Sequence, residues 1–332
     1  MRPLSNLKSL HRFIYFQYST RTMSTDVHLR RSYLYVPSSS DRMLEKSLTS
    51  NSDVIIYDLE DSIAPSPTDK KDARNKLLRF LNRSKPLHAS QIAVRINGIN
   101  TPFFYEDISQ IASLTSVETL ILPKIHSAQD IYHVSRAIRV ASGNQPREES
   151  LKIVPSIESA QALWNLGSIA GWKSEYGSEA GGKLSALLFA AEDYCADTGI
   201  IRSPSRRELL YTRSQIVIAA KAFGLEAIDM VCVNYKDTDY LKEECHDGRY
   251  LGFTGKQAIH PAQVNIIQSA FGPSPTEILR AAKIIKQMAL AHASQKGAAG
   301  LEGEMIDAPM LKQAEKTLAS AKAAGLDIPS VP

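Results

Sequence analysis

The stretch SYLYVPSSSDRMLEKSLTSNSDVIIYDLED, residues 32–61, contains the unit from which we predict the fold. An apolar and aromatic run (32–37) is followed by a helix-forming segment (41–50) and then by a second apolar run (53–61). Both runs are largely apolar at successive positions, which is typical of parallel strands covered on both faces. The stretch therefore predicts a strand–helix–strand unit with parallel strands.

Similar apolar runs recur as far as residue 259, and segments with helical periodicity separate them. Eight such units match the size of a (β/α)8 barrel. A doubly wound open sheet would also alternate strands and helices, but its phosphate-binding turn needs GxGxxG after the first strand, and VPSSSDR (36–42) lacks it. We therefore predict a (β/α)8 (TIM) barrel. The predicted strands lie in residues 32–37, 53–61, 92–98, 119–125, 152–159, 186–194, 227–235 and 252–259.

Residues 1–25 differ in composition from the barrel segment. They contain four Lys and Arg residues, several Ser and Thr residues and no acid, and a helix would gather five apolar side chains on one face. A basic, amphipathic, acid-free start is typical of a mitochondrial transit peptide. We predict such a peptide at 1–25 and a mitochondrial location. The alternatives are a disordered tail, or initiation at Met23, which would give a cytosolic form.

The rest of the chain divides into a barrel domain at 31–272 and a C-terminal helical extension at 273–332. The extension contains a helical segment at 275–294, the glycine-containing linker QKGAAGLEGE (295–304) and a final helical segment at 311–325. It is longer than closure of a barrel requires, so we expect it to act as a lid.

Composition excludes several classes of protein. Cys195, Cys232 and Cys245 are too few for a disulfide framework and show no CxxC spacing, which favours a reducing compartment and no zinc site. No run approaches the roughly 18 apolar residues of a membrane span. The net charge of +4 comes from residues 1–25, because the rest of the chain has 35 bases and 35 acids. We therefore expect no nucleic-acid partner and no membrane partner.

Polar and charged side chains gather where the predicted strands end. A charged group beside an apolar run costs free energy if it is buried alone, and the active site of a (β/α)8 barrel lies at the carboxyl ends of the strands. One such residue would be a helix cap or a structural ion pair, but six polar strand ends predict an active site. The residues are Asp58, Glu60, Asp61, Arg95, Asn97, Lys124, Glu158, Glu192, Asp193, Lys256 and, just beyond, His260.

Glu158 and Asp193 are the candidate metal ligands. They end neighbouring predicted strands, so their carboxylates are expected to lie within one coordination sphere. Two oxygen ligands without a His or Cys cluster suit Mg²⁺, which keeps water ligands and leaves positions for a substrate. Alternatively, Glu158 interacts with the N-terminus of the following helix. The acids of DLED (58–61) are further potential ligands, but we assign Glu60 and Asp61 to orienting waters or neighbouring bases.

Arg95 is expected at the same end of the barrel. Its guanidinium can bind a carboxylate in bidentate fashion or stabilise a developing enolate oxygen. A salt bridge to the acids of residues 58–61 is the alternative and is compatible with that role.

Two helical segments after the first two predicted strands carry a second basic group. These bases form either a solvated helix face or a binding site for a polyanion above this edge of the barrel. A nucleotide diphosphate fits better than DNA, because the chain has no Lys/Arg stripe with interleaved aromatic residues. The bases are Arg42, Lys46, Lys70, Lys71 and Arg74.

The segments around these residues form a recognisable set. They are RSYLYVPSSSDRMLEK, IIYDLEDSIAP, KKDAR, AVRING, LPKI, PSIESAQALWNL, AAEDYCADTG, GLEAIDMV and GFTGKQAIHPAQV. In this order, across about residues 31–323, the chain resembles the citrate lyase β-subunit family of acyl-CoA carbon–carbon lyases. EGEMIDAPMLKQAE (302–315) resembles the mitochondrial citramalyl-CoA lyase branch of that family.

The resemblance implies a role for each matching position. Glu158 and Asp193 match Mg²⁺ ligands, and Arg95 matches a residue that contacts the acyl substrate. Asp307 matches a catalytic acid/base that enters the site from a neighbouring subunit of a homotrimer; the residues alone indicate only a helix N-terminus there. The positions that fall in the region of the CoA moiety are Arg42, Lys46, Lys70, Lys71, Arg74, Ile259 and His260.

Two segments depart from the family pattern. Relatives commonly have VPG where this chain has Val36-Pro37-Ser38, and FG-ED where it has Phe189-Ala190-Ala191-Glu192. Both changes replace a glycine near the ligand, which affects the expected adenosine contacts and the pocket width.

The implied reaction is a reversible, Mg²⁺-dependent retro-Claisen cleavage of (S)-citramalyl-CoA to acetyl-CoA and pyruvate. Malyl-CoA is an alternative substrate, since one methyl group is worth only about 1–3 kcal/mol in a pocket. The competing hypotheses are a malyl-CoA thioesterase, a citrate lyase β subunit that is inactive alone, and a metal-dependent aldolase that does not use CoA.

Overall fold

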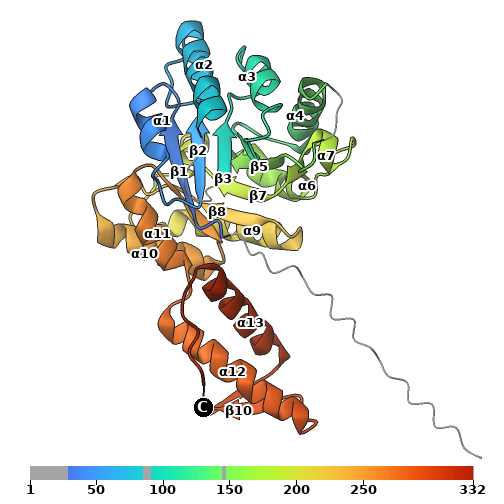
Figure 1. The fold of residues 1–332 in the computed structure, drawn as a ribbon, viewed down its shortest axis with the longest axis vertical. Coiled ribbons are helices and arrows are strands. Elements are labelled where there is room, and N and C mark those ends of the chain that lie inside the picture. Colours follow the sequence, from blue (N-terminus) through green and yellow to red (C-terminus); the bar gives the residue numbers. More distant parts are fainter. Residues whose placement is uncertain (1–28, 85–90, 144–146, 332) are drawn as a thin grey trace, which may run out of the picture.

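The computed structural model describes residues 29–84, 91–143 and 147–331, and a closed barrel of parallel strands forms its centre (Figure 1). Successive strands pair along the chain, β4 pairs with β5, and β9 pairs with β1 to complete the circle. β6 and β7 both pair with β5 and act as one interrupted strand. The predicted (β/α)8 barrel is confirmed. The strands are β1 Ser32–Pro37, β2 Val54–Asp58, β3 Gln91–Arg95, β4 Thr119–Leu122, β5 Lys152–Ile157, β6 Lys183–Leu184, β7 Ala186–Phe189, β8 Glu226–Asp229 and β9 Gly255–Ala258.

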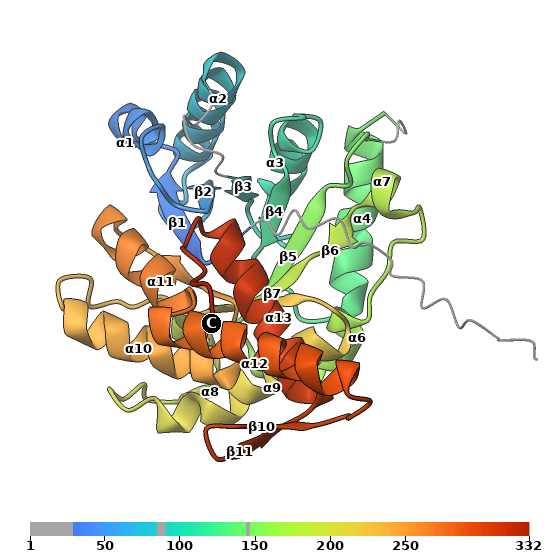
Figure 2. The same cartoon turned by 60° about the horizontal axis from the view of Figure 1, so that its bottom comes forward.

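Helices surround the barrel, as Figure 2 shows from a second direction. Several begin at caps that the sequence supplies: the Ser66 side chain accepts a hydrogen bond from the Asp69 amide and Pro67 opens α2. The helices are α1 Asp41–Ser47, α2 Pro67–Arg83, α3 Phe104–Ile111, α4 Ala128–Ala141, α5 Ala160–Trp164, α6 Leu166–Ala170, α7 Ser178–Gly181, α8 Ala191–Thr198, η1 Arg207–Leu209, α9 Leu210–Ala222, α10 Thr238–Leu251, η2 Pro261–Gln263 and α11 Val264–Phe271.

The buried side chains of the strands alternate between two cores. One set fills the barrel interior, and the other set, with Leu34, Ile55 and Val94 among its members, packs between the strands and the helices. Both faces of most strands are therefore apolar, which explains the continuous apolar runs of the sequence. β9 is the exception, because it buries Lys256 and Gln257. The inner set is Tyr33, Val54, Ile56, Ala93, Ile121, Val154, Ala186, Leu188 and Ile228.

Most of the strands end earlier than the sequence predicts. β7 ends at Phe189 and α8 begins at Ala191, so Asp193 lies in the first turn of that helix and not at a strand end. β8 ends at Asp229, inside the predicted run 227–235. In the sequence, apolar residues continue beyond the last residue that is hydrogen-bonded to a neighbouring strand. The predicted runs were therefore too long, and they included the polar residues that follow the strands.

The C-terminal extension is a separate layer below the barrel in Figure 1. It contains α12 Pro275–Ala293, β10 Ala299–Leu301, β11 Glu304–Ile306 and α13 Ala308–Ala323, with its own small apolar core. Lys316 and Thr317 of α13 lie with Arg31 and Thr254 around a cavity at the end of the barrel where the strands begin. The extension therefore contacts the amino ends of the strands.

Several other predictions concern membrane spans, cysteines and the N-terminal segment. Within the described ranges, no helix is both long and apolar enough to cross a membrane. Cys195, Cys232 and Cys245 are free thiols. The predicted transit peptide at 1–25 lies outside the described residues.

Candidate active site

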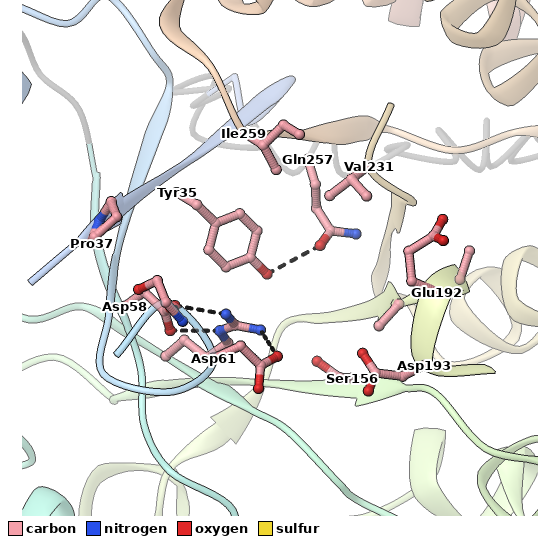
Figure 3. Close-up of a pocket in the computed structure, with 14 residues that line it drawn as sticks. Tyr35, Pro37, Asp58, Asp61, Ser156, Glu192, Asp193, Val231, Gln257 and Ile259 are labelled. Atoms are coloured by element: carbon pink, nitrogen blue, oxygen red, sulfur yellow. Dashed lines mark hydrogen bonds and ion pairs between the residues drawn. The ribbon is translucent and has the colours of Figure 1, made fainter. Parts of the chain in front are cut away.

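A cavity of about 370 Å³ lies at the carboxyl ends of the barrel strands. Figure 3 shows acids on two sides of it, with Asp58 and Asp61 facing Ser156, Glu192 and Asp193. The lining residues are Tyr35, Pro37, Asp58, Asp61, Ser62, Arg95, Ser156, Ala190, Ala191, Glu192, Asp193, Val231, Gln257 and Ile259.

The cavity continues the inward-facing rows of the strands. Asp58 comes two residues after Ile56, Arg95 two after Ala93, and Ser156 two after Val154. Since side chains two apart on a strand point to the same face, these polar groups lie directly above the apolar barrel interior. The periodicity that buries the core therefore also positions the site.

Arg95 is held by three carboxylates. Its Nε and Nη2 each donate to one oxygen of Asp58 at 2.7 Å, and its Nη1 lies 2.9 Å from Glu60 and 3.3 Å from Asp61. The guanidinium carbon is 4.9 Å from the ring centre of Tyr35. The alternative salt bridge to the acids is thus present, and it fixes the guanidinium at the cavity wall.

Burial separates the pKa values of the two inner acids of this group. Burial alone would raise the pKa of Asp58, but the hydrogen bonds and charge of Arg95 outweigh it and the pKa lies below its usual value. For Glu60, burial raises the pKa to about 8 in spite of Arg95, and the neighbouring acids Asp61 and Glu158 add to the rise. Negative charge is therefore in excess here.

The pH dependence of stability is expected to change in Glu60→Gln. The unfolded glutamate loses its proton near pH 4.5, whereas the folded one keeps it until about pH 8. The folded state therefore binds the extra proton, and its stability falls as pH rises through this window. In the presence of a chelator, urea unfolding should show the variant more stable than the wild type at pH 9, by up to roughly 5 kcal/mol, with the difference at pH 5 below about 1 kcal/mol. If the free energies of unfolding of the two proteins changed in parallel with pH, Glu60 would not be buried as described.

The two candidate metal ligands converge on one cationic atom. Lys124 Nζ lies 2.5 Å from Oδ1 of Asp193 and 3.2 Å from Oε1 of Glu158. The Glu158 side chain is 4% exposed and accepts a hydrogen bond from the Lys124 amide at 2.7 Å. Burial raises the pKa of Glu158, and Asp193 adds to the rise, while Lys124 opposes it.

This donor set fits a divalent cation with several open positions. Two carboxylates, Glu158 directly after β5 and Asp193 in α8, point to a single position, and the surrounding acids outnumber Arg95 and Lys124. The described residues form no group of three or more His, Cys, Asp or Glu that could hold a metal. Mg²⁺ commonly binds one or two carboxylates and keeps its remaining ligands as water or substrate, so the residues suit it.

The basic residues of α1 and α2 separate into two kinds. Arg42 and Lys46 on α1, and Lys71 on α2, are exposed. Lys70 is buried, and its Nζ donates to the carbonyl oxygens of Leu59 and Glu60. Lys70 therefore supports the loop that carries Glu60 and Asp61.

Arg74 is the second buried base. The residue is 1% exposed, and its guanidinium pairs with Asp107 at 2.7 Å and with Glu106 at 2.6 Å. Asp107 also accepts two hydrogen bonds from Asn97. This geometry gives Arg74 a structural role between α2 and α3, so we leave it out of the CoA site proposed below.

Arg74→Met is expected to lower the free energy of unfolding by about 3–5 kcal/mol, because it leaves the buried Asp107 carboxylate unpaired. Lys71→Met, on the exposed side of the same helix, should change it by less than about 0.5 kcal/mol. Urea unfolding of the two variants measures the difference. Equal stabilities would contradict the buried ion pair.

Lys256 does not reach the cavity, contrary to the expectation for the eighth strand end. It is fully buried, donates to the Met230 carbonyl at 2.7 Å and pairs with Glu244 at 3.1 Å. The adjacent Gln257 faces the cavity instead, because successive strand residues point to opposite faces.

Ile259 and His260 follow β9 at the rim. Ile259 lines the cavity and both residues are exposed. The His260 ring stacks on Tyr235, with 5.0 Å between ring centres.

Asp307 is remote from the cavity of the same chain. It is exposed and caps α13, where its side chain accepts from the Met310 amide at 3.5 Å. None of the described residues of the extension lines the cavity, and α13 meets the opposite end of the barrel. An action of Asp307 at this site therefore requires a second subunit or a large movement of the extension.

The two departures from the glycine pattern cause no backbone strain. Neither Ser38 nor Ala190 has a positive φ. Ser38 is buried, and Ala190 contributes its side chain to the cavity wall.

Sequence reasoning assigned no role to several residues of the site. Gln257 donates to the carbonyls of Phe189 and Asp229 and accepts from the Tyr35 hydroxyl, so it joins three strands below the cavity. Ser156 adds a hydroxyl to the wall. Tyr35 and Ser156 could have been found from the sequence, because each lies two residues after an apolar residue that faces the barrel interior, Tyr33 and Val154 respectively.

The fold and the site define an enzyme of the (β/α)8 class with an acidic site at the strand ends. The chain matches the HpcH/HpaI aldolase/citrate lyase family over residues 31–261 and belongs to that family. The resemblance inferred from the sequence is confirmed, and with it the class of carbon–carbon lyases that act on CoA esters.

Three relatives illustrate the range of the family. Citramalyl-CoA lyase, mitochondrial, of Homo sapiens is 33% identical over 87% of this chain and 84% of its own length. The (3S)-malyl-CoA thioesterase of Cereibacter sphaeroides is 32% identical over 91% of this chain and 98% of its own. The structure of CitE from Mycobacterium tuberculosis in complex with magnesium, acetoacetate and coenzyme A has a TM-score of 0.69 and 28% identity, covering 90% and 99% of the two chains.

Proposed function

We propose that this protein is a Mg²⁺-dependent (S)-citramalyl-CoA lyase that forms acetyl-CoA and pyruvate. The convergence of Glu158 and Asp193 on one position carries the proposal, because Asp193 lines the same cavity as Arg95 and a chelating 2-hydroxy acid can use a cation site and a fixed guanidinium in one cavity. The similarity to citramalyl-CoA lyases supports the choice of substrate.

The reaction needs one proton to be moved and one carbon–carbon bond to break. Loss of the proton from the tertiary hydroxyl lets the bond between this carbon and the thioester CH2 break. The hydroxyl oxygen becomes the keto oxygen of pyruvate, and the electron pair moves to a thioester enolate. The enolate then takes a proton on carbon to give acetyl-CoA.

The chain supplies groups for each part. A bound Mg²⁺ would lower the pKa of the hydroxyl and fix the adjacent carboxylate. Arg95, fixed by Asp58, faces the cavity as a cation for the developing enolate. We assign the proton transfer to Asp307 of a neighbouring subunit in a homotrimer, since Asp307 is remote from its own cavity.

The CoA moiety is assigned to the rim above α1 and α2. The exposed bases there are Arg42, Lys46 and Lys71, and Ile259 and His260 lie at the rim after β9. Arg42, Lys46 and Lys71 offer positive charge for a diphosphate, and because they are exposed they need not be brought out of a buried position to bind it. The proposed mitochondrial location rests on the composition of residues 1–25.

A comparison of substrates tests the assignment. Purified protein with Mg²⁺ should release a 2-oxo acid from citramalyl-CoA with a kcat/KM about ten-fold or more above that for malyl-CoA, because one buried methyl group is worth about 1–3 kcal/mol. Citryl-CoA should be the poorest substrate of the three. A preference for malyl-CoA would assign the protein to malyl-CoA cleavage, and an inert chain would favour a subunit that needs partners.

A further inference from the structure

Lys124 contacts both candidate metal ligands and has no assigned role. It follows β4, and its ammonium lies 2.5 Å from Asp193 and 3.2 Å from Glu158. Its backbone N–H donates to the same Glu158 oxygen at 2.7 Å. Two groups of one residue therefore fix Glu158, and one of them also bridges to Asp193.

The backbone of Lys124 has an unusual conformation. Its φ is +54°, in the left-handed region that residues other than glycine, asparagine and aspartate seldom adopt. Such a conformation persists only when its surroundings enforce it, and it is frequent at functional sites. Here it is accompanied by the simultaneous approach of the amide and the ammonium to Glu158.

The ammonium stands where a divalent cation would need to be. Magnesium binds carboxylate oxygens at about 2.0–2.1 Å, and the oxygens available to it are the ones that Lys124 contacts. Glu158 is 4% exposed, so its carboxylate has little water to stabilise it without a cation. The two cations therefore compete for one pair of ligands.

We propose that Lys124 is a built-in counter-cation of the metal site, which holds Glu158 and Asp193 together in the metal-free protein and is displaced when the divalent cation binds. The proposal rests on the assignment of this pair as the metal site. It makes metal binding an exchange of one cation for another, so Lys124 weakens the affinity for metal while it keeps the empty site ordered.

Direct metal binding to the full-length protein tests this exchange. Calorimetric titration with Mg²⁺ is expected to give a dissociation constant at least ten-fold lower for Lys124→Met than for the wild type. In chelator the variant should have a lower Tm, and saturating Mg²⁺ should remove most of that difference. Lys124→Gln, which keeps a polar side chain, should also bind Mg²⁺ more tightly than the wild type. It serves as the test variant if Lys124→Met does not fold.

Lys152→Met is the matched control. Lys152 pairs with Glu118 at 3.3 Å at the start of β5, the opposite end of the same strand from Glu158. Its loss should leave the Mg²⁺ affinity unchanged. Equal or weaker binding in both Lys124 variants, with normal binding in the wild type, would overturn the counter-cation. A wild type that binds no Mg²⁺ would instead overturn the metal site itself.

Discussion

Asp307→Asn is expected to lower kcat by at least about a hundred-fold and to leave binding of a CoA thioester nearly unchanged. A carboxylate that transfers the proton contributes roughly 10²–10⁴-fold to the rate, and asparagine keeps its shape without its basicity. The substitution also keeps an acceptor for the Met310 amide, so α13 should stay capped. Steady-state kinetics with citramalyl-CoA and a binding titration with acetyl-CoA measure the two effects.

The position of Asp307 makes a sharper experiment possible. Because the cavity of the same chain contains no described residue of the extension, the proposed site combines the Glu158 of one subunit with the Asp307 of another. Mixing inactive Asp307→Asn with inactive Glu158→Ala protein, after subunit exchange, should restore part of the activity. No recovery in verified mixed oligomers would contradict a site shared between subunits, and near-normal turnover of Asp307→Asn would remove Asp307 from the mechanism.

Glu158→Ala is expected to abolish Mg²⁺ binding and to lower turnover by at least about a thousand-fold, a loss of roughly 4 kcal/mol of transition-state stabilisation. Asp193 alone offers one carboxylate, and Lys124 would then neutralise it. Calorimetry and the release of pyruvate report the two losses separately.

Glu118→Ala is the matched control for this change. Glu118 pairs with Lys152 near the beginnings of β4 and β5, so its loss removes a carboxylate from the end of the barrel away from the cavity. Its activity and metal dependence should match the wild type. An active Glu158→Ala variant that ignores chelator would refute the metal assignment.

The fold was predictable because most of the strands are apolar on both faces. The runs at 53–61 and 152–159 each contain a buried strand, β2 and β5, although both strands end before the predicted runs do. What the runs do not indicate is where the last ladder hydrogen bond falls. The end of β7 is an example, since Asp193 looks like a strand residue but belongs to the first turn of α8.

The approach of Asp193 and Glu158 to one position was predictable from the order of the strands, but two other features of the site were not. Lys256 and Gln257 are adjacent, and only the register of β9 decides which one faces the cavity. Lys70 and Arg74 resemble exposed helix bases in the sequence, and only the packing of α2 on its neighbours buries them.

The fate of the thioester bond tests the central claim most directly. Product analysis of citramalyl-CoA incubated with the purified protein and Mg²⁺ should show acetyl-CoA and pyruvate in equal amounts, with no free CoA, and chelator should stop the formation of both. Free CoA together with intact citramalate would contradict carbon–carbon cleavage, because it would show hydrolysis of the thioester.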